Sequence, residues 1–353
     1  MKRWILLFLS FSLITSCKKE PKLKTEHGAV FQGISIDTLL TDSISIRAIL
    51  VASDTVWYAA NDGKYGYLNL NSKKAFSGHV AKDTLALEFR SIASTKKHVF
   101  ILNVANPALL YRISKDGSKI DLVYWEKHDK VFYDSMQFWN ANDGIAMGDP
   151  TENCLSVIVT RDGGKTWKKI PCENLPKVIE GEAAFAASNT NLIVRGNNAW
   201  MVSGGKKARI FHSSDKGNSW KVYETPIIQG KTMTGIFTAA FYDANNGFIA
   251  GGDYEVQGQN FQNKAITSDG GKTWKLIAEK QGFGYASCVQ YVPESDGKQL
   301  VCVGGTGLFY SSDSGNSWTQ FSKDSSLYTI RFQNDSTAIA AGKNKIIRIH
   351  FNK

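Results

Sequence analysis

Seven segments of this chain combine short apolar stretches with a polar turn between them, a pattern that predicts pairs of antiparallel strands. In the clearest one, Ser135 to Asp149, an apolar stretch reaches Trp139 and a turn rich in Asn, Asp and Gly precedes the second stretch. Such residues favour turns because they bond to their own backbone or adopt left-handed conformations. The other six segments are Ile46 to Ala60, Phe89 to Asn103, Ala183 to Gly204, Phe237 to Asp253, Tyr285 to Gly305 and Tyr328 to Gly342.

A second pattern, S/T-x-D-x-G-x-S/T-W, occurs four times, with repeat distances of 53, 54 and 44 residues. In each copy the Asp is expected to bond to its own turn, the Gly to supply a positive φ and the Trp to begin the return strand. Turn chemistry accounts for every position, so we assign these residues a structural role. The Asp and Trp residues are Asp162, Trp167, Asp215, Trp220, Asp269, Trp274, Asp313 and Trp318.

A repeat of this length indicates a β-propeller or a solenoid, and the strand pairs favour the propeller. Each strand pair would supply the first two strands of a blade, and each Asp-containing turn would join the third and fourth. The last unit supplies three strands, and the apolar residues of the segment Ala29 to Leu39 suit a fourth that closes the ring. We therefore expect an all-β, seven-bladed propeller over residues 29–353, closed by an N-terminal strand.

Residues 1–16 are typical of a lipoprotein signal peptide, because Lys2 and Arg3 precede an apolar run. The stretch Leu13-Ile14-Thr15-Ser16-Cys17 resembles a bacterial lipobox, which predicts cleavage before Cys17 and a lipid on its sulfur. An ordinary signal peptide or an N-terminal anchor helix is the alternative, although the apolar run is too short to span a bilayer. Residues 17–28 would then form the lipidated cysteine and a polar tether. We expect a lipid-anchored protein of the bacterial cell envelope, on the periplasmic or surface side of the outer membrane.

Four cysteines follow Cys17, and export would place them in an oxidising compartment. Cys154 and Cys172 lie symmetrically about Gly163, and Cys288 and Cys302 about Ser295. Residues with a constant index sum face each other in an antiparallel hairpin, so both pairs are candidate disulfides. Four small buried thiols are the alternative.

The net charge of +10 comes from scattered basic residues without Arg and aromatic residues interleaved, which favours a solvated surface over a nucleic-acid groove. The six His residues lack paired spacing and no C-x-x-C occurs, so no metal site is indicated. The chain has neither a P-loop nor a dinucleotide-binding glycine pattern. We expect no cofactor, no nucleic-acid partner and a monomer.

In a propeller, first strands begin and second strands end on the same face, so their polar residues should meet at one mouth of the channel. The residues placed there are Arg47, Arg90, Asp149, Glu182, Asp253, Tyr254 and Tyr285. Two interpretations stay open. The charges could neutralise one another as ion pairs, or the arginines could hold an anionic group while the carboxylates handle protons or sugar hydroxyls. The polar stretch Glu255 to Asn263 would be a lid over this mouth or a surface loop without a role.

Several short phrases of the chain resemble one bacterial family of propellers. They are Ile46-Arg47-Ala48-Ile49 with Val56-Trp57, Phe89-Arg90-Ser91, Gly148-Asp149-Pro150, Gly181 to Ser188, Gly235-Ile236-Phe237 and Gly251-Gly252-Asp253-Tyr254. The family is known as photosystem II stability/assembly factor-like, BNR-repeat glycosyl hydrolase-like or simply oxidoreductase. The resemblance runs from about Ser43 to the C-terminus and implies a seven-bladed propeller. The repeated turn likewise resembles the Asp-box of BNR repeats, which occurs in sialidases and in propellers without enzymatic activity.

The resemblance implies two kinds of function. The photosynthetic members are scaffolds that bind an assembling membrane protein through an Arg-rich patch, so we expect a non-catalytic scaffold for a protein or glycan partner. The alternative is an exo-acting, sialidase-like glycoside hydrolase that uses Asp149, Glu182 or Asp253 as its catalytic carboxylates. Sialidases carry an R-I-P phrase that this chain lacks. An oxidoreductase comes third because no cofactor motif supports it.

Overall fold

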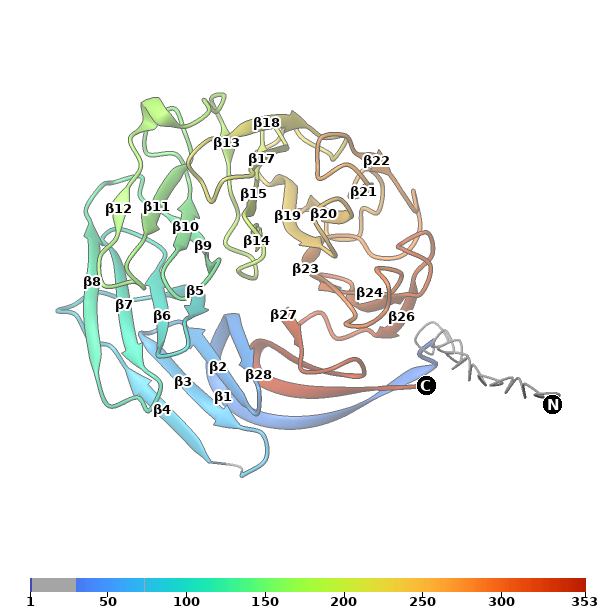
Figure 1. Cartoon of the computed structure of the whole chain (residues 1–353), viewed down its shortest axis with the longest axis horizontal. Helices are drawn as coiled ribbons and strands as arrows, with labels where there is room; N and C mark the ends of the chain where they lie inside the picture. Colours follow the sequence, from blue (N-terminus) through green and yellow to red (C-terminus); the bar gives the residue numbers. More distant parts are fainter. Residues whose placement is uncertain (2–29, 73) are drawn as a thin grey trace.

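The computed structural model describes residue 1, residues 30–72 and residues 74–353. The expected signal peptide, the lipidation site Cys17 and the tether lie outside the described residues. The described part is all-β, and its antiparallel sheets are arranged around a central axis as a propeller (Figure 1). Its one helical element is the 3₁₀ turn η1 (Cys172–Asn174). A search of these residues for a helix long and apolar enough to cross a membrane finds none.

The strands of the described residues form six sheets. Four sheets have four strands each: β5 (Phe89–Ser94), β6 (His98–Asn103), β7 (Ala108–Ser114) and β8 (Ile120–Glu126); β9 (Tyr133–Phe138), β10 (Gly144–Gly148), β11 (Ser156–Thr160) and β12 (Lys168–Lys169); β14 (Leu192–Arg195), β15 (Asn198–Val202), β17 (Arg209–Ser213) and β18 (Lys221–Glu224); β23 (Ala286–Tyr291), β24 (Leu300–Gly304), β25 (Gly307–Ser311) and β26 (Thr319–Ser322).

Two sheets have six strands each. The first contains β13 (Glu182–Ala183), β16 (Gly204–Gly205), β19 (Thr234–Phe241), β20 (Gly247–Asp253), β21 (Lys264–Thr267) and β22 (Lys275–Leu276). The second contains β27 (Leu327–Phe332), β28 (Thr337–Asn352), β1 (Gly33–Ala52), β2 (Thr55–Ala60), β3 (Lys64–Asn69) and β4 (Ala75–His79).

The prediction of seven blades is wrong, because the propeller has six sheets. Strand pairs are present in all seven expected segments, although in the fourth, Ala183 to Gly204, the pair begins only at Leu192. The first and the last pairs belong to the same sheet. The reason is that β1 is one continuous strand of 20 residues. Its first part, from Gly33 to Ser45, pairs with β28, and its second part, from Ile46 to Ala52, pairs with β2. The N-terminal strand therefore joins the two ends of the chain within one sheet.

Apolar side chains fill the spaces between neighbouring sheets, and the repeated turns contribute to them. Trp167, which follows the first turn, packs edge-on against Phe138, with ring centroids 5.7 Å apart. In that turn the carboxylate of Asp162 accepts the backbone N–H groups of Lys165 and Thr166, both at 3.0 Å. Burial raises the pKa of Asp162, but these hydrogen bonds outweigh burial and lower the pKa to about 2. The turn thus holds its conformation through an ionised side chain.

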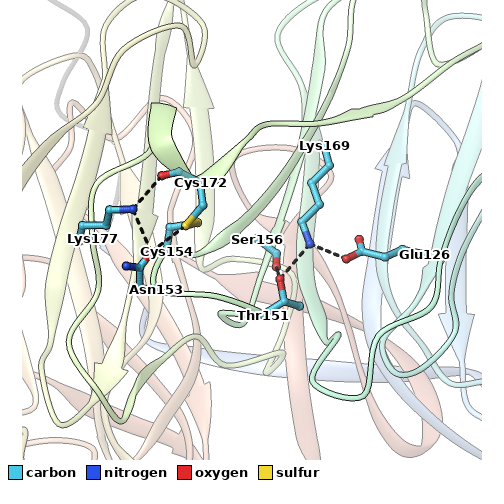
Figure 2. The surroundings of a disulfide bond; sticks show 8 residues. All are labelled: Glu126, Thr151, Asn153, Cys154, Ser156, Lys169, Cys172 and Lys177. Carbon is cyan, nitrogen blue, oxygen red and sulfur yellow. Dashed lines mark hydrogen bonds and ion pairs between the residues drawn. A yellow bond between two sulfur atoms is a disulfide. The ribbon is translucent and has the colours of Figure 1, made fainter.

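A disulfide joins Cys154 to Cys172 across a sequence separation of 18 residues, with the Cα atoms 5.7 Å apart (Figure 2). It links the chain just before β11 to the 3₁₀ turn η1. Lys177 crosses beside this bond, where its ammonium group donates to the side-chain oxygen of Asn153 at 2.9 Å and to the carbonyl of Cys172 at 3.4 Å (Figure 2). Together these contacts fasten the loop that follows β12 to the one that follows β10.

The second expected disulfide is absent, because Cys288 and Cys302 are free and buried. A register shift next to Ser287 places Cys302 opposite Val289 instead of Cys288. Neighbouring residues of a strand point to opposite faces, so the two thiols enter different cores. Cys288 packs in the cluster with Ile330, and Cys302 in the cluster with Phe283. The symmetric spacing could not reveal the additional residue in the first strand.

Candidate functional site

Among the described residues, six inner strands carry a register shift at the equivalent position, close to where the strand begins or, in β1, close to where its second part begins. A β-bulge leaves one residue without a partner and redirects its side chain. In every case a buried residue precedes the bulged residue and a small one follows it, as in Tyr133-Asp134-Ser135. The bulged residues are Arg47, Arg90, Asp134, Phe237, Ser287 and Tyr328. Local backbone geometry therefore sets which side chains surround the channel.

Residues 184–191, which we name the plug segment, lie in the channel and form hydrogen bonds with inner strands around it. Asn189 donates to the carbonyl of Ile92 at 2.8 Å and accepts the N–H of Met136 at 2.9 Å. Ser188 donates to the carbonyl of Ser287 at 2.6 Å. Further bonds to β1, β19 and β27 complete the set. The plug segment therefore closes the channel. It belongs to the fourth expected strand pair, Ala183 to Gly204, whose first strand was expected to border the channel.

A cavity of about 370 Å³, which we name the mouth cavity, opens above the plug segment. Its floor is formed by the residues from Ala183 to Ala187. Five of the seven site residues expected from the sequence line it, namely Arg47, Arg90, Asp149, Tyr254 and Tyr285. The prediction that strand starts and strand ends meet at one mouth thus agrees with this geometry.

Arg47 is the cation of the mouth cavity without a carboxylate partner among the described residues. Its guanidinium donates to the carbonyl of Ala187 at 3.3 Å and lies 4.3 Å from the ring centroid of Tyr328. Arg90 differs, because its guanidinium forms an ion pair with Glu88 at 2.7 Å. Arg47 therefore contributes a charge that a ligand can neutralise.

Aromatic rings form the wall of the mouth cavity on the side of β19 and β23. Phe185 of the plug segment stacks on Phe237, with ring centroids 3.9 Å apart. Tyr285 meets both Phe237 and Tyr254 edge-on, with centroids 4.8 Å and 5.1 Å apart. Tyr254 keeps 38% of its surface exposed, whereas Tyr285 is buried. Aromatic rings and arginines around one cavity suit a ligand with an apolar part and a negative charge.

Asp149 is the carboxylate that lines the mouth cavity. Its side-chain oxygen accepts the N–H of Ala184 at 2.7 Å, which ties the end of β10 to the plug segment. Part of the residue is exposed, but its carboxyl group is surrounded by protein, and this burial raises its pKa to about 6. The single bond to Ala184 offsets the effect only in part.

Behind Asp149 lies Asp134, a fully buried residue whose two carboxyl oxygens have no hydrogen-bond partner among the described residues. Burial raises its pKa well above the usual range, and the charge of Asp149 raises it further, while Arg90 lowers it. A buried carboxyl group without a partner is costly to ionise. The two aspartates therefore influence each other's ionisation, and Arg90 is the cation that acts on Asp134.

Glu182 and Asp253, the other two candidate carboxylates, do not line the mouth cavity. The Glu182 side chain is fully buried, forms an ion pair with Arg209 and accepts the hydroxyl of Ser203 at 2.6 Å. Asp253 is also buried. Its carboxylate accepts the backbone N–H of Glu255 at 2.9 Å and forms an ion pair with Lys231 at 3.4 Å. For these two residues the structure matches the interpretation in which charges neutralise one another.

Several residues of this site were not expected from the sequence, above all Asp134, Phe185 and Phe237. Asp134 lies one residue before Ser135, where the expected strand pair begins. The pattern of an apolar residue, a variable residue and a small residue, shared with Ile46-Arg47-Ala48, is the signal that identifies it. The stretch Glu255 to Asn263, for which the sequence left a lid or a surface loop open, supplies none of the residues that line the cavity. The carbonyl of Gln257 accepts the N–H of Tyr285 at 2.8 Å.

No family model and no curated protein sequence matches this chain. Solved structures do match. A structure described as YCF48 bound to D1 peptide has a TM-score of 0.66 and 13% identity, over 92% of this chain and 96% of that one. The structure of YCF48 from Cyanidioschyzon merolae has a TM-score of 0.64 and 13% identity, over 91% of this chain and 98% of that one. A GH74 xyloglucanase from Xanthomonas campestris has a TM-score of 0.63 and 10% identity, over 89% of this chain and 53% of that one.

Similarities at these identities show the fold, which is a β-propeller shared by binding proteins and glycoside hydrolases. Among the described residues, no three His, Cys, Asp or Glu side chains lie close enough together to hold a metal ion. The chemistry that the mouth cavity offers is therefore that of its two arginines, one carboxyl group and several aromatic rings.

Proposed function

We propose that this protein is a non-catalytic scaffold that binds a protein partner through the mouth cavity. The partner would insert a short segment with a negatively charged group and an apolar or aromatic side chain. Arg47 would hold the charge, and the rings of Phe237 and Tyr254 would contact the apolar part. A likeness in fold to YCF48, one structure of which contains a D1 peptide, supports peptide binding as the activity of such a ring.

The observation that carries this proposal is the state of the charges around the mouth. Arg47 has no carboxylate partner among the described residues, whereas Glu182 and Asp253 are buried in ion pairs. An arginine held beside a cavity in this way is a recognition group for an anion. A rigid, closed ring positions it without a change of shape.

The glycoside hydrolase alternative is less well supported. Glycosidases of the usual kind place two carboxyl groups on either side of the scissile bond. Here Asp149 is the acid that lines the cavity, and its neighbour Asp134 is fully buried and out of reach of a sugar. The fold likeness to a GH74 xyloglucanase covers about half of that enzyme. A binding function needs no second carboxyl group, so the side chains that line the cavity suffice for it.

Membrane attachment is part of the same proposal. The lipobox-like sequence before Cys17 supports a lipid anchor, and the tether up to residue 28 would hold the ring near the outer membrane of a bacterial envelope. Partners would then be proteins or glycans of that compartment. Mass spectrometry of the full chain recovered from membranes, compared with Cys17→Ser, tests this part.

The binding proposal is tested with an array of 15-residue peptides that vary in charge and aromatic content. We expect peptides with acidic and aromatic residues to bind the full chain and Arg47→Gln to weaken this binding about tenfold or more, as for the loss of one charge-assisted hydrogen bond. Lys275→Gln, on the exposed outer strand β22, is the matched control and should bind as the unchanged chain does.

Two results would count against the proposal. One is equal binding by Arg47→Gln and the unchanged chain. The other is hydrolysis of a chromogenic glycoside by the unchanged chain and not by Asp149→Asn, because that outcome would establish an enzyme at the same cavity.

A further inference from the structure

A second cavity, of about 550 Å³, lies where the inner strands end, and we name it the far cavity. Gln137, Phe241 and Tyr291, which line it, are at or next to the last residue of β9, β19 and β23. The residues just before these same strands line the mouth cavity. Since the three strands run in the same direction, the far cavity opens at the opposite end of the channel.

The plug segment separates the two cavities. Residues from Ala184 to Ala187 border the mouth cavity, whereas Thr190 borders the far cavity. The hydroxyl of Thr190 bonds to that of Thr238 at 2.7 Å, and its carbonyl accepts the N–H of Ala239 at 2.8 Å. A ligand in the far cavity would thus contact a different set of residues from one in the mouth cavity.

Two arginines line the far cavity, and neither has a carboxylate within ion-pair distance among the described residues. Arg331, on β27, donates to the carbonyl of Ser188 and to the hydroxyl of Thr329, both at 3.0 Å. Arg195, the exposed last residue of β14, donates to the carbonyl of Phe241 at 3.4 Å. Neutral partners orient both guanidinium groups and leave their charges uncompensated.

The acidic residues near these arginines compensate little of this charge. Glu294 lines the far cavity but is exposed to solvent. Asp243 interacts with Arg195 at longer range, and its carboxylate accepts the backbone N–H groups of Asn245 and Asn246 at 2.7 Å and 2.6 Å. Solvent screens an exposed carboxylate, so the far cavity keeps a positive character.

Tyrosines provide the remaining wall. The rings of Tyr242 and Tyr291 meet edge-on with their centroids 5.7 Å apart, and both residues line the far cavity. Neither hydroxyl has a hydrogen-bond partner among the described residues. Phenol groups donate to anionic oxygens, and their rings bury carbon. The far cavity therefore combines two cations with aromatic and apolar surface, and its volume is in the range of small-molecule sites.

We propose that the far cavity binds a small organic anion whose carboxylate or phosphate group is held by Arg195 and Arg331. The carbon skeleton of this anion would contact Tyr242 and Tyr291. This site is separate from the mouth cavity, and its occupation does not depend on the scaffold function proposed above. A carboxylate and a phosphate share the chemistry that two guanidinium groups recognise.

Isothermal titration calorimetry on the full chain tests this proposal. The probes are inorganic phosphate and glucuronate at pH 7, each at the ionic strength of a sodium chloride control. We expect one of them to bind and Arg195→Gln to weaken its binding about tenfold or more. Arg195 is exposed and makes one long hydrogen bond, so this variant should fold normally. Arg331→Gln is the second variant, with thermal unfolding as a check that it is folded.

Lys168→Gln, on the exposed outer strand β12, is the matched control, because Lys168 lines neither the far cavity nor the mouth cavity. Its binding of the probe should equal that of the unchanged chain. Preference for phosphate or for glucuronate identifies the anionic group. Binding of neither probe, or binding that is equal in Arg195→Gln and the unchanged chain, would overturn the proposal. A loss in Arg47→Gln alone would assign the anion to the mouth cavity instead.

Discussion

The side-chain oxygen of Asn189 accepts the backbone N–H of Met136 at 2.9 Å. Because β9 is an edge strand of its sheet, this residue of the plug segment bonds to the free edge of β9 where a further strand would otherwise pair. The same side chain donates to the carbonyl of Ile92 on β5 at 2.8 Å. Asn189 adopts a φ of 59°, a conformation that Asn tolerates better than most residues. One amide thus bonds two sheets to the centre of the ring.

Replacing Asn189 with Ala is expected to lower the free energy of unfolding by about 2 to 4 kcal/mol, since a buried N–H and a buried carbonyl each lose a partner. Urea denaturation followed by tryptophan fluorescence measures this. Asn71→Ala, in an exposed turn, is the control and should change the value by less than about 0.5 kcal/mol. Equal stability of both variants would mean that the plug segment is not needed to hold the ring together.

Removing the disulfide with Cys154→Ser and Cys172→Ser together is expected to lower the free energy of unfolding by about 3 kcal/mol, from the loop-closure entropy of an 18-residue separation. A reducing agent should have the same effect on the unchanged chain. Cys302→Ala, at a buried free thiol, keeps the Cys154–Cys172 bond and should lose as much stability to the reducing agent as the unchanged chain does, whereas the double variant should not respond. A response in the double variant would show that another bond is being reduced.

The aspartate pair predicts a stability that falls as the pH rises. The pKa of Asp149 in the folded state is about 6, above that of an exposed carboxyl group. Its favourable contribution is therefore complete below pH 4 and is lost as the pH rises through 6, by about 2 to 3 kcal/mol. Asp134 acts in the same direction. Urea midpoints measured between pH 4 and 8 should show the decline.

Asp134→Asn should remove part of this decline, because an amide carries no charge at any pH in the range. We expect the variant to be more stable than the unchanged chain at pH 8 and to lose less stability between pH 5 and 8. Asp253→Asn is the contrasting change: it weakens an ion pair with Lys231 and should destabilise the chain at pH 8. A lower midpoint for Asp134→Asn at pH 8 would contradict the unpartnered state of Asp134.

The repeated turns should respond to acid in the opposite sense. Hydrogen bonds from the turn outweigh burial and lower the pKa of Asp269 to about 2, so its contribution is present above pH 4 and is lost as the pH falls through 2. Asp269→Ala should cost about 1 to 2 kcal/mol at pH 7, as for the loss of a capping side chain. The difference from the unchanged chain should narrow at pH 2. A constant difference would mean that the charge is not involved.

Much of this site followed from the order of the strands. Arg47 and Arg90 precede small residues at strand starts, and Asp149 and Tyr254 follow strand ends, so chain direction alone placed them at one mouth. Glu182 occupies a similar position in sequence, but its carboxylate turns to Arg209, which lies 27 residues further along the chain. Which charges pair internally depends on side-chain packing that strand order does not specify.

The sequence by itself determined an all-β propeller, the turns built on Asp and Gly, and the face where polar strand ends gather, because these follow from local patterns of period two and from turn chemistry. The tertiary structure decided the rest. It joined the first and last strand pairs through β1, inserted one bulged residue in each of six inner strands, separated Cys288 from Cys302 and placed Asn189 in the channel. These outcomes depend on contacts between residues far apart in the chain, whose free energies decide between arrangements that are locally equivalent.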